Sequence, residues 1–315
     1  MWLGIEIGGT KLQLGVGAGE GSGLAELVRR DVDRSQGADG ILRSIEESVS
    51  LLQGRHPVRG IGFGFGGPVD TGKGRVITSH QVNGWEGFEM ADWCTDRFGL
   101  PIVLGNDCNA AALAEARFGA GRDYARVFYV TVGTGIGGGY IVNGILQAAD
   151  SPAASEIGHL RPGLDAEDPG RTLESLAAGP GIEAAARARI ADAGHTSPEV
   201  AELLVNCGGD LSQLTVKQVG EAAAGGHALS RDILGQANRA LGWGIAQVIT
   251  LLGVHAVIVG GGVSLLGEEL FYKPLRDFVS AYVFPPLRGT FDILPPALGE
   301  EVVVHGALAF ARDGL

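Results

Sequence analysis

Apolar and polar positions along the 315-residue chain change their period several times, and the changes predict a mixed α/β protein. Short, largely apolar runs, most of them closed by glycine, predict strands at 2–7, 12–16, 24–34, 58–65, 101–104, 127–132, 140–142, 254–259 and 291–294. Longer stretches with a helical apolar stripe or many helix formers predict helices at 37–53, 110–117, 181–193, 199–205, 216–224, 227–252 and 300–312. Strands that alternate with helices in this way are typical of an α/β sheet.

Two segments join a pair of predicted strands through a glycine-rich turn. The first hairpin covers residues 2–16, and its turn is Gly8-Gly9-Thr10-Lys11. The N–H groups of such a turn, with the Thr10 hydroxyl and the Lys11 charge, form an anion site of the kind that binds phosphate. An ordinary surface hairpin explains this segment equally well, so both interpretations stay open here.

The second hairpin covers residues 127–142, with Gly133-Thr-Gly-Ile-Gly-Gly-Gly139 between its strands. The letters also satisfy the dinucleotide pattern GxGxxG. That pattern requires a helix next and an acidic residue about 20 positions later, and neither follows. We therefore predict a second phosphate-type turn at Thr134 and Gly135, and a duplicated architecture with one hairpin per domain.

The junction between the predicted strand 101–104 and the helix 110–117 carries Asn106, Asp107 and Asn109. Any one of these residues alone is a good helix N-cap. A strand that opens into a helix is also where open α/β sheets bind ligands. A carboxylate held there beside an amide can take a proton from a hydroxyl group, which makes Asp107 a candidate general base.

Further polar and glycine positions are candidates of lower specificity. Ser79, Gln81 and Asn83 lie in a predicted loop, and Gly67 follows a strand of alternating glycines. Glu156 and His159 have a spacing that places them on one face of a turn, and Glu174 follows. Taken singly, Glu156 fits a solvated side chain and His159 a structural histidine; a metal site built from Glu156, His159 and Glu174 also stays open.

Composition and charge narrow the functional classes. Hydrophobic residues make up 45% and charged residues 19%, as in an ordered globular protein, and 315 residues suffice for two domains. The net charge of −12 argues against nucleic acid and anionic membrane surfaces as partners. Three scattered cysteines, Cys94, Cys108 and Cys207, form neither a disulfide framework nor a CxxC zinc motif, so we expect a reducing, cytoplasmic location.

Two features concern the chain as a whole. A strand that starts next to Met1 argues against a signal peptide. The apolar stretch 245–259 is interrupted by polar residues, so it predicts a buried helix and strand instead of a membrane span.

Glycine is abundant, with 53 residues against a usual share of about 7%. The glycines gather where strands end, the last cluster being Gly260-Gly261-Gly262, and such clusters suggest backbone wrapped around a bulky polar ligand.

The chain resembles the sugar kinases of the ROK (repressor/ORF/kinase) family, which have the hexokinase–actin ATPase fold. The resemblance runs from end to end and rests on seven motifs in the family's order. These are Gly4-Ile-Glu-Ile-Gly-Gly-Thr-Lys11, Gly64-Phe-Gly-Gly-Pro68, Asn106-Asp-Cys-Asn109, Gly133-Thr-Gly-Ile-Gly-Gly-Gly139, Glu156-Ile-Gly-His159, Leu173-Glu174 and Val259-Gly-Gly-Gly262.

The resemblance implies a two-domain α/β fold, of the ribonuclease H-like actin ATPase class, with a cleft between the domains. We expect a small domain from 1–107 plus 300–315, closed by the C-terminal helix, and a large domain from 108–299. Asp107 is implied as the catalytic base. Sugar hydroxyls are implied to bind Gly67, Asn106, Asp107, Glu156, His159 and Glu174. Phosphates and adenosine are implied to bind Gly8, Gly9, Thr10, Lys11, Thr134, Gly135, Gly260, Gly261 and Gly262.

The implied activity is ATP- and Mg²⁺-dependent phosphorylation of a hexose, with glucose the first expectation and N-acetylmannosamine, fructose or allose as alternatives. A homodimer is implied, and polyphosphate stays open as the phosphoryl donor. Two departures stand out: Glu6 replaces the family's aspartate, which helps to place Mg²⁺ through water, and 161–172 lacks the zinc-binding cysteines, so we expect no zinc. These two departures leave open the alternative that the protein binds a sugar but has no kinase activity. A sugar-responsive repressor is disfavoured by the acidic charge, and a dinucleotide oxidoreductase by the second hairpin.

Overall fold

The computed structural model describes residues 1–21, 23–79, 81–151, 153–163, 168–193, 200, 203–205 and 207–315. The contacts group the chain into two units. Unit 1 contains residues 1–129, 139–155 and 296–315, and unit 2 contains 130–138 and 156–295. This grouping places residues 108–118 with the N-terminal strands, whereas the sequence-based division drew its boundary after Asp107; that division stays a prediction.

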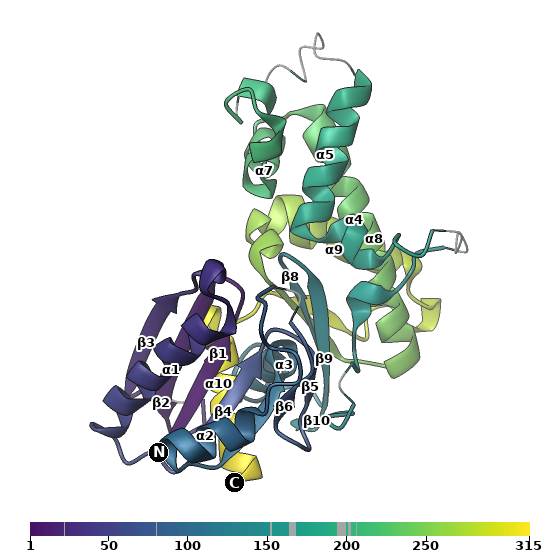
Figure 1. Ribbon diagram of the computed structural model, residues 1–315. Helices are drawn as coiled ribbons and strands as arrows, with labels where there is room; N and C mark the ends of the chain where they lie inside the picture. The colour runs from purple at the N-terminus through teal and green to yellow at the C-terminus, as the bar shows by residue number, and fades with distance from the viewer. Residues whose placement is uncertain are drawn as a thin grey trace. The chain divides into compact units, whose positions relative to one another are not determined.

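Two five-stranded sheets form the framework. Figure 1 labels β1 to β4 of the first sheet and β8 to β10 of the second. The first has the order β3-β2-β1-β4-β7, and the second has the order β10-β9-β8-β11-β12. Each sheet therefore places its third, second, first, fourth and fifth strands side by side in the same succession. The repeated order agrees with the duplicated architecture expected from the two hairpins, and each hairpin (β1–β2 and β8–β9) supplies the first two strands of its sheet.

Each predicted run contains or overlaps a strand, and the short strands β5, β6 and β10 lie outside the predicted runs. The strands are β1 (Trp2–Ile7), β2 (Lys11–Gly17), β3 (Glu26–Asp31), β4 (Ile61–Phe65), β5 (Val69–Asp70), β6 (Arg75–Val76), β7 (Ile102–Asn106), β8 (Arg126–Val132), β9 (Ile136–Val142), β10 (Ile145–Leu146), β11 (Ala256–Gly260) and β12 (Asp292–Leu294). One difference is informative: β9 begins at Ile136, not at Tyr140, because the glycines after Gly135 adopt strand geometry. The turn of the second hairpin is therefore as short as that of the first.

The helices are α1 (Gly37–Gln53), α2 (Met90–Phe98), α3 (Asp107–Phe118), α4 (Leu173–Ala177), α5 (Gly179–Ala193), α7 (Val216–Ala224), α8 (Ala228–Leu252), α9 (Lys273–Tyr282) and α10 (Val302–Gly314). The helices α1, α3, α5, α7, α8 and α10 match predicted stretches, whereas α2, α4 and α9 lie outside those stretches. The helix predicted at 199–205 lies mostly outside the described residues. The segment after Gly261 begins as a 3-10 turn (Gly262–Leu266) and a π turn (Glu268–Tyr272) before it becomes α9.

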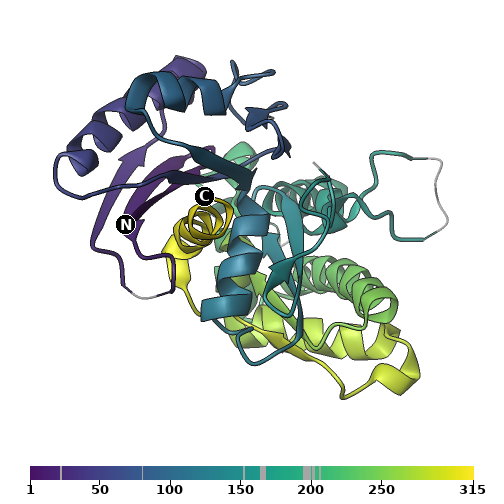
Figure 2. The same cartoon turned by 90° about the horizontal axis from the view of Figure 1, so that it is seen from below.

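Glycines in the first sheet explain how α10 packs in unit 1. A Cβ on Gly4 would lie 2.5 Å from the carbonyl oxygen of Val304, and a Cβ on Gly62 would overlap the carbonyl oxygen of Ala307. The sheet therefore presents a smooth glycine face to α10, while Phe63 and the other strand apolar residues pack on the opposite face. Figure 2 shows α10 along one face of the sheet and α1 and α2 on the other. Both faces are buried, which explains the continuous burial of these strands.

The buried interior of unit 2 centres on α8, which contacts α4, α5, α7 and α9 (Figure 1). Its apolar stripe, including Leu234, Leu241 and Ile245, is buried as the helical spacing predicts. Gly253 ends the helix in the left-handed conformation, with φ of 58°. No helix among the described residues is long and apolar enough to cross a membrane.

Candidate functional site

Three parallel strands of unit 1 end at the same edge of the sheet. β4 lies between β1 and β7, and its last residue, Phe65, pairs with Ile7 on one side and Asn106 on the other. The residues that follow, Gly8 and Asp107 among them, therefore come out at one edge. This carboxyl edge is where α/β sheets place their ligand sites.

Asn106 turns the end of β7 into the start of α3. Its side-chain oxygen accepts hydrogen bonds from the backbone N–H groups of Cys108 (2.8 Å) and Asn109 (3.2 Å), so it is the helix N-cap. Its amide nitrogen donates to the carbonyl oxygen of Gly67 at 3.2 Å. Asn106 thus ties the predicted sugar-site glycine to the junction. The N-cap interpretation holds for Asn106, and it leaves Asp107 as the first residue of the helix.

The Asp107 carboxyl group lies beside backbone, with part of its surface accessible. Its Oδ1 accepts the Cys108 N–H at 2.8 Å, and a Cβ on Gly66 would lie 3.4 Å from Oδ2. A Cβ at Gly66 would therefore be in van der Waals contact with this oxygen. Burial by the surrounding protein raises the pKa of Asp107 above its usual range, and the bond from the Cys108 N–H opposes the shift. A carboxylate with a raised pKa is a better proton acceptor than an ordinary surface aspartate.

Glu6 forms the charged centre of the first hairpin. Its carboxylate accepts a hydrogen bond from Gln13 Nε2 at 2.9 Å and pairs with Lys11 Nζ at 3.2 Å. Burial raises the pKa of Glu6, the neighbouring Asp107 charge adds to the shift and Lys11 opposes it, which together place this pKa at about 7. The two carboxylates therefore repel each other, which is a feature of sites that hold a cation.

The first glycine turn is held from outside by two side chains. Arg34 Nε donates to the carbonyl oxygen of Gly9 at 2.6 Å. Gln81 lies against Gly9, where a Cβ would overlap its amide oxygen. A small pocket in unit 1 is lined by both glycines of the turn together with Gly66, Ser79 and Gln81 among others. The turn and the strand ends thus form one surface, with Thr10 exposed.

The second glycine turn, in unit 2, is held by backbone. The Gly133 N–H donates to the Gly135 carbonyl oxygen at 2.9 Å, and the Gly179 N–H donates to the Gly133 carbonyl oxygen at 2.8 Å. Gly261, with φ of 91°, lies against the end of β8, where a Cβ would be 2.5 Å from the Val132 carbonyl oxygen. The structure therefore brings the predicted phosphate turn and the predicted adenosine glycines together.

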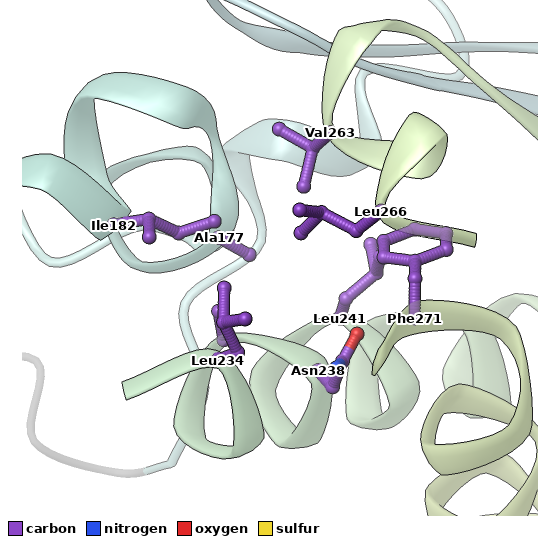
Figure 3. A pocket seen from close by; sticks show the side chains of 9 residues that line it. Ala177, Ile182, Leu234, Asn238, Leu241, Val263, Leu266 and Phe271 are labelled. Carbon is purple, nitrogen blue, oxygen red and sulfur yellow. The ribbon is translucent and has the colours of Figure 1, made fainter. Parts of the chain in front are cut away.

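A small apolar cavity lies next to these glycines in unit 2 (Figure 3). Val263, one residue after Gly262, points into it, and Asn238 is its one polar side chain. The Asn238 amide donates to the Leu270 carbonyl oxygen at 2.8 Å. The other lining residues are Ala177, Ile182, Leu234, Ala237, Leu241, Leu266 and Phe271.

The segments that carry Glu156, His159 and Glu174 meet at Ile136, the first residue of β9. Glu174 Oε2 accepts the Ile136 N–H at 2.8 Å, and a Cβ on Gly158 would overlap the Ile136 carbonyl oxygen. The His159 N–H donates to the Glu156 carbonyl oxygen at 3.1 Å within the 3-10 turn Ile157–His159, so the predicted common turn is present. Ser155, just before it, has a φ of 64°.

Within the described ranges, no three His, Cys, Asp or Glu side chains gather in the manner of a metal centre. Glu156, His159 and Glu174 therefore do not form the metal site that the sequence left open. In unit 1, Glu6 and Asp107 are two neighbouring carboxylates, and Lys11 and Gln13 contact the Glu6 carboxylate.

Sequence reasoning missed several residues around the first hairpin. Gln13 is only 1% exposed, and Arg34 contacts the turn from a separate segment. Gln13 left a signal, because a glutamine between Leu12 and Leu14 in a strand buried on both faces must find a polar partner. Arg34 left none, since its contact depends on how the chain returns after β3.

The chain matches the sequence profile of the ROK family over residues 2–314. The chain belongs to the ROK family. A glucokinase of Streptomyces coelicolor is 30% identical over 317 residues, covering 99% of this chain and 97% of that protein. A glucokinase of Thermotoga maritima is 29% identical over 315 residues, covering 99% and 97%.

Among solved structures, this ROK chain is similar to a ROK family glucokinase from Streptomyces griseus in complex with glucose and AMPPNP. The identity is 32%, each chain is covered to 99%, and the TM-score is 0.83. The expected hexokinase/actin-like ATPase fold is thereby confirmed, as is the ROK resemblance.

Proposed function

We propose that this ROK chain is an ATP-dependent sugar kinase that transfers the γ-phosphoryl group of ATP to a hydroxyl of glucose, which gives glucose 6-phosphate. One observation carries the proposal. The Streptomyces griseus glucokinase that matches 99% of this chain was crystallised with glucose and an ATP analogue. In this chain the matching fold presents a carboxylate, Asp107, and a glycine turn at one edge of the first sheet.

We assign Asp107 as the general base. A sugar hydroxyl is a weak nucleophile, and a carboxylate that accepts its proton during phosphoryl transfer strengthens it. The raised pKa of Asp107 supports this role because the carboxylate then holds a proton more firmly once it is transferred. Asn106 and the Cys108 N–H would orient the carboxylate at the start of α3.

We assign the phosphates to the two glycine turns, with Gly8, Gly9, Thr10 and Lys11 in unit 1. In unit 2 the assigned groups are Thr134 and Gly135 for phosphate and Gly260, Gly261 and Gly262 for adenosine. Phosphoryl transfer depends mainly on alignment and neutralisation of charge, which N–H groups and an ammonium provide.

The residues of unit 1 fit Mg²⁺ held through water. Glu6 and Asp107 repel each other, and a divalent cation relieves such repulsion. Mg²⁺ binds through one or two carboxylates, waters and substrate phosphates instead of a protein cage. When bound, it would neutralise charge on the transferred phosphoryl group. Lys11 and Gln13 hold Glu6 in place for this role.

We assign the sugar hydroxyls to Gly67 and Asn106 in unit 1. In unit 2 we assign them to Glu156, His159 and Glu174, whose segments meet at Ile136. Carboxylates and amides that bind hydroxyls reject analogues that lack them, because the polar groups would be left without partners.

The direct test measures ADP release from Mg-ATP with purified protein and a panel of hexoses. We expect glucose to stimulate release, and Asp107→Asn to lower kcat by about 10³-fold while glucose binding persists. The control variant is Asp210→Asn, a cap of an exposed 3-10 turn, which should keep full activity.

Three outcomes would change the proposal. Asp107→Asn activity within about tenfold of the wild type would remove Asp107 from its role. Glucose binding without ADP release, with polyphosphate also inactive as donor, would favour a sugar-binding protein. Stronger stimulation by N-acetylmannosamine, fructose or allose would change the substrate. The homodimer and the cytoplasmic location stay predictions.

A further inference from the structure

Glu115 is a fully buried carboxylate that the catalytic roles assigned above do not include. It lies on α3, the helix that Asp107 begins, and is 0% exposed. Its Oε2 accepts the Ala120 N–H at 2.8 Å. Its Oε1 accepts the N–H groups of Ala297 (2.9 Å) and Leu298 (2.8 Å). A buried carboxylate whose partners are all backbone N–H groups is costly if these hydrogen bonds are lost. The bonds therefore hold two segments in place, the one at Ala120 and the one at Ala297 and Leu298.

Ala297 and Leu298 lie in residues 296–301, which connect β12 to α10. We call these residues the connector. Its other end touches the first hairpin. The Glu300 carbonyl oxygen accepts hydrogen bonds from Lys11 Nζ (3.3 Å) and Gln13 Nε2 (3.1 Å). Glu301 pairs with Arg29, whose Nε donates to Gln13 Oε1 at 3.2 Å.

Lys11 and Gln13 are also the two groups that hold the Glu6 carboxylate. Polar contacts therefore join Glu115 on α3 to one end of the connector, and join the other end of the connector to Lys11, which pairs with Glu6. All of these residues belong to unit 1.

We propose that Glu115 is a positioning residue that sets the Lys11 ammonium for the phosphates of the nucleotide by fixing the connector on α3. The inference rests on the proposed function, since it takes the first glycine turn as a phosphate site. A wrongly placed Lys11 ammonium weakens binding of the nucleotide, while the groups assigned to the sugar stay in place.

A purely structural role for Glu115 predicts something different. A carboxylate that only supports the fold would lower thermal stability, and the affinities for glucose and nucleotide would change together or remain unchanged. The distinguishing quantity is the dependence of the Glu115 effect on Lys11.

The test is a double-mutant cycle read by the dissociation constant of AMPPNP. Glu115→Gln keeps the shape of the side chain but turns one oxygen into a donor that faces a backbone N–H. We expect Glu115→Gln to weaken AMPPNP binding about tenfold and to leave the glucose dissociation constant within about twofold. In a Lys11→Met background the same change should weaken AMPPNP binding less than about twofold.

Glu183→Gln is the matched control, because Glu183 Oε1 also accepts a backbone N–H, that of Val216 at 3.2 Å, in unit 2. It should leave AMPPNP binding unchanged. Glu115→Asp, which keeps the charge and shifts the oxygens, serves if Glu115→Gln does not fold, and we expect it to weaken AMPPNP binding in the same Lys11-dependent way.

An equal Glu115 effect with and without Lys11, or unchanged AMPPNP binding in the folded variant, would overturn the inference. Since the cycle is read by binding, wild-type protein that binds AMPPNP but releases no ADP would contradict the kinase activity alone. Wild-type protein that does not bind AMPPNP would contradict both.

Discussion

The two glycine turns occupy equivalent places in sheets of the same strand order, yet they are held by different forces. The turn between β1 and β2 lies among ionisable side chains: Glu6, Lys11 and Arg34 contact it or each other. The turn between β8 and β9 is held by backbone N–H groups, by close glycine contacts and by one carboxylate, Glu174.

The difference shows that one local sequence pattern can be stabilised in two ways, by charged side chains or by close packing. A strand, a short glycine turn and a threonine present N–H groups in both cases. The first turn adds charge, so it should respond to charge removal, pH and salt. The second adds close packing, so it should respond to volume and be nearly indifferent to salt.

The largest expected effect tests the packed turn. A Cβ on Gly158 would overlap the Ile136 carbonyl oxygen at the start of β9, and backbone cannot move aside cheaply. We expect Gly158→Ala to lower the free energy of unfolding by about 3 kcal/mol and to weaken glucose binding, as measured by urea unfolding and by titration.

Two alanine variants provide the contrast. Gly9→Ala in the first turn meets the side chain of Gln81, whose amide end can rotate away but whose Cβ lies 3.0 Å from the added methyl group, so it should cost about 1 kcal/mol, less than Gly158→Ala. Gly235→Ala, on α8 with open space around it, should be neutral or stabilising. Equal losses at Gly158 and Gly9 would erase the distinction between the turns.

The sequence predicted most of the frame because its signals are local. Glycine clusters after apolar runs located both turns, and the polar junction at Asp107 located the edge of the first sheet. Long-range partners escaped prediction: Gln13 meets Glu300 across 287 positions of the chain. Glu115 looked like part of an ordinary alanine-rich helix, because nothing nearby in the sequence indicates that 296–301 returns to it.

A second effect concerns the charged turn and pH. The pKa of Glu6 is raised from 4.5 to about 7, mainly by burial, with the Asp107 charge adding to the shift and Lys11 and Gln13 opposing it. A raised folded-state pKa stabilises the fold at low pH, and this contribution disappears as pH rises through about 7. Between pH 5 and 8 we expect the wild type to lose about 2 kcal/mol of unfolding free energy relative to Glu6→Gln.

Urea unfolding at both pH values, in EDTA to exclude divalent cations, measures this difference. Glu174→Gln is the matched variant for the second turn, because it removes the carboxylate that holds that turn. A Glu6→Gln protein whose stability changes with pH as the wild type's does would show that Glu6 does not titrate in this range.

The smallest effect separates the turns by salt. Lys11 is partly exposed and acts as a point charge, so its attraction for phosphate is screened by salt, whereas the Thr134 hydroxyl offers a neutral hydrogen bond. We expect Lys11→Met to weaken AMPPNP binding about tenfold at low salt and about threefold at high salt. Thr134→Val should weaken it about twofold at either salt concentration, as an exposed neutral bond is worth less than 1 kcal/mol. If salt changes the AMPPNP affinity of the two variants alike, the first turn does not bind phosphate through the Lys11 charge. The proposal that Glu115 positions the Lys11 ammonium through the connector would then fail as well.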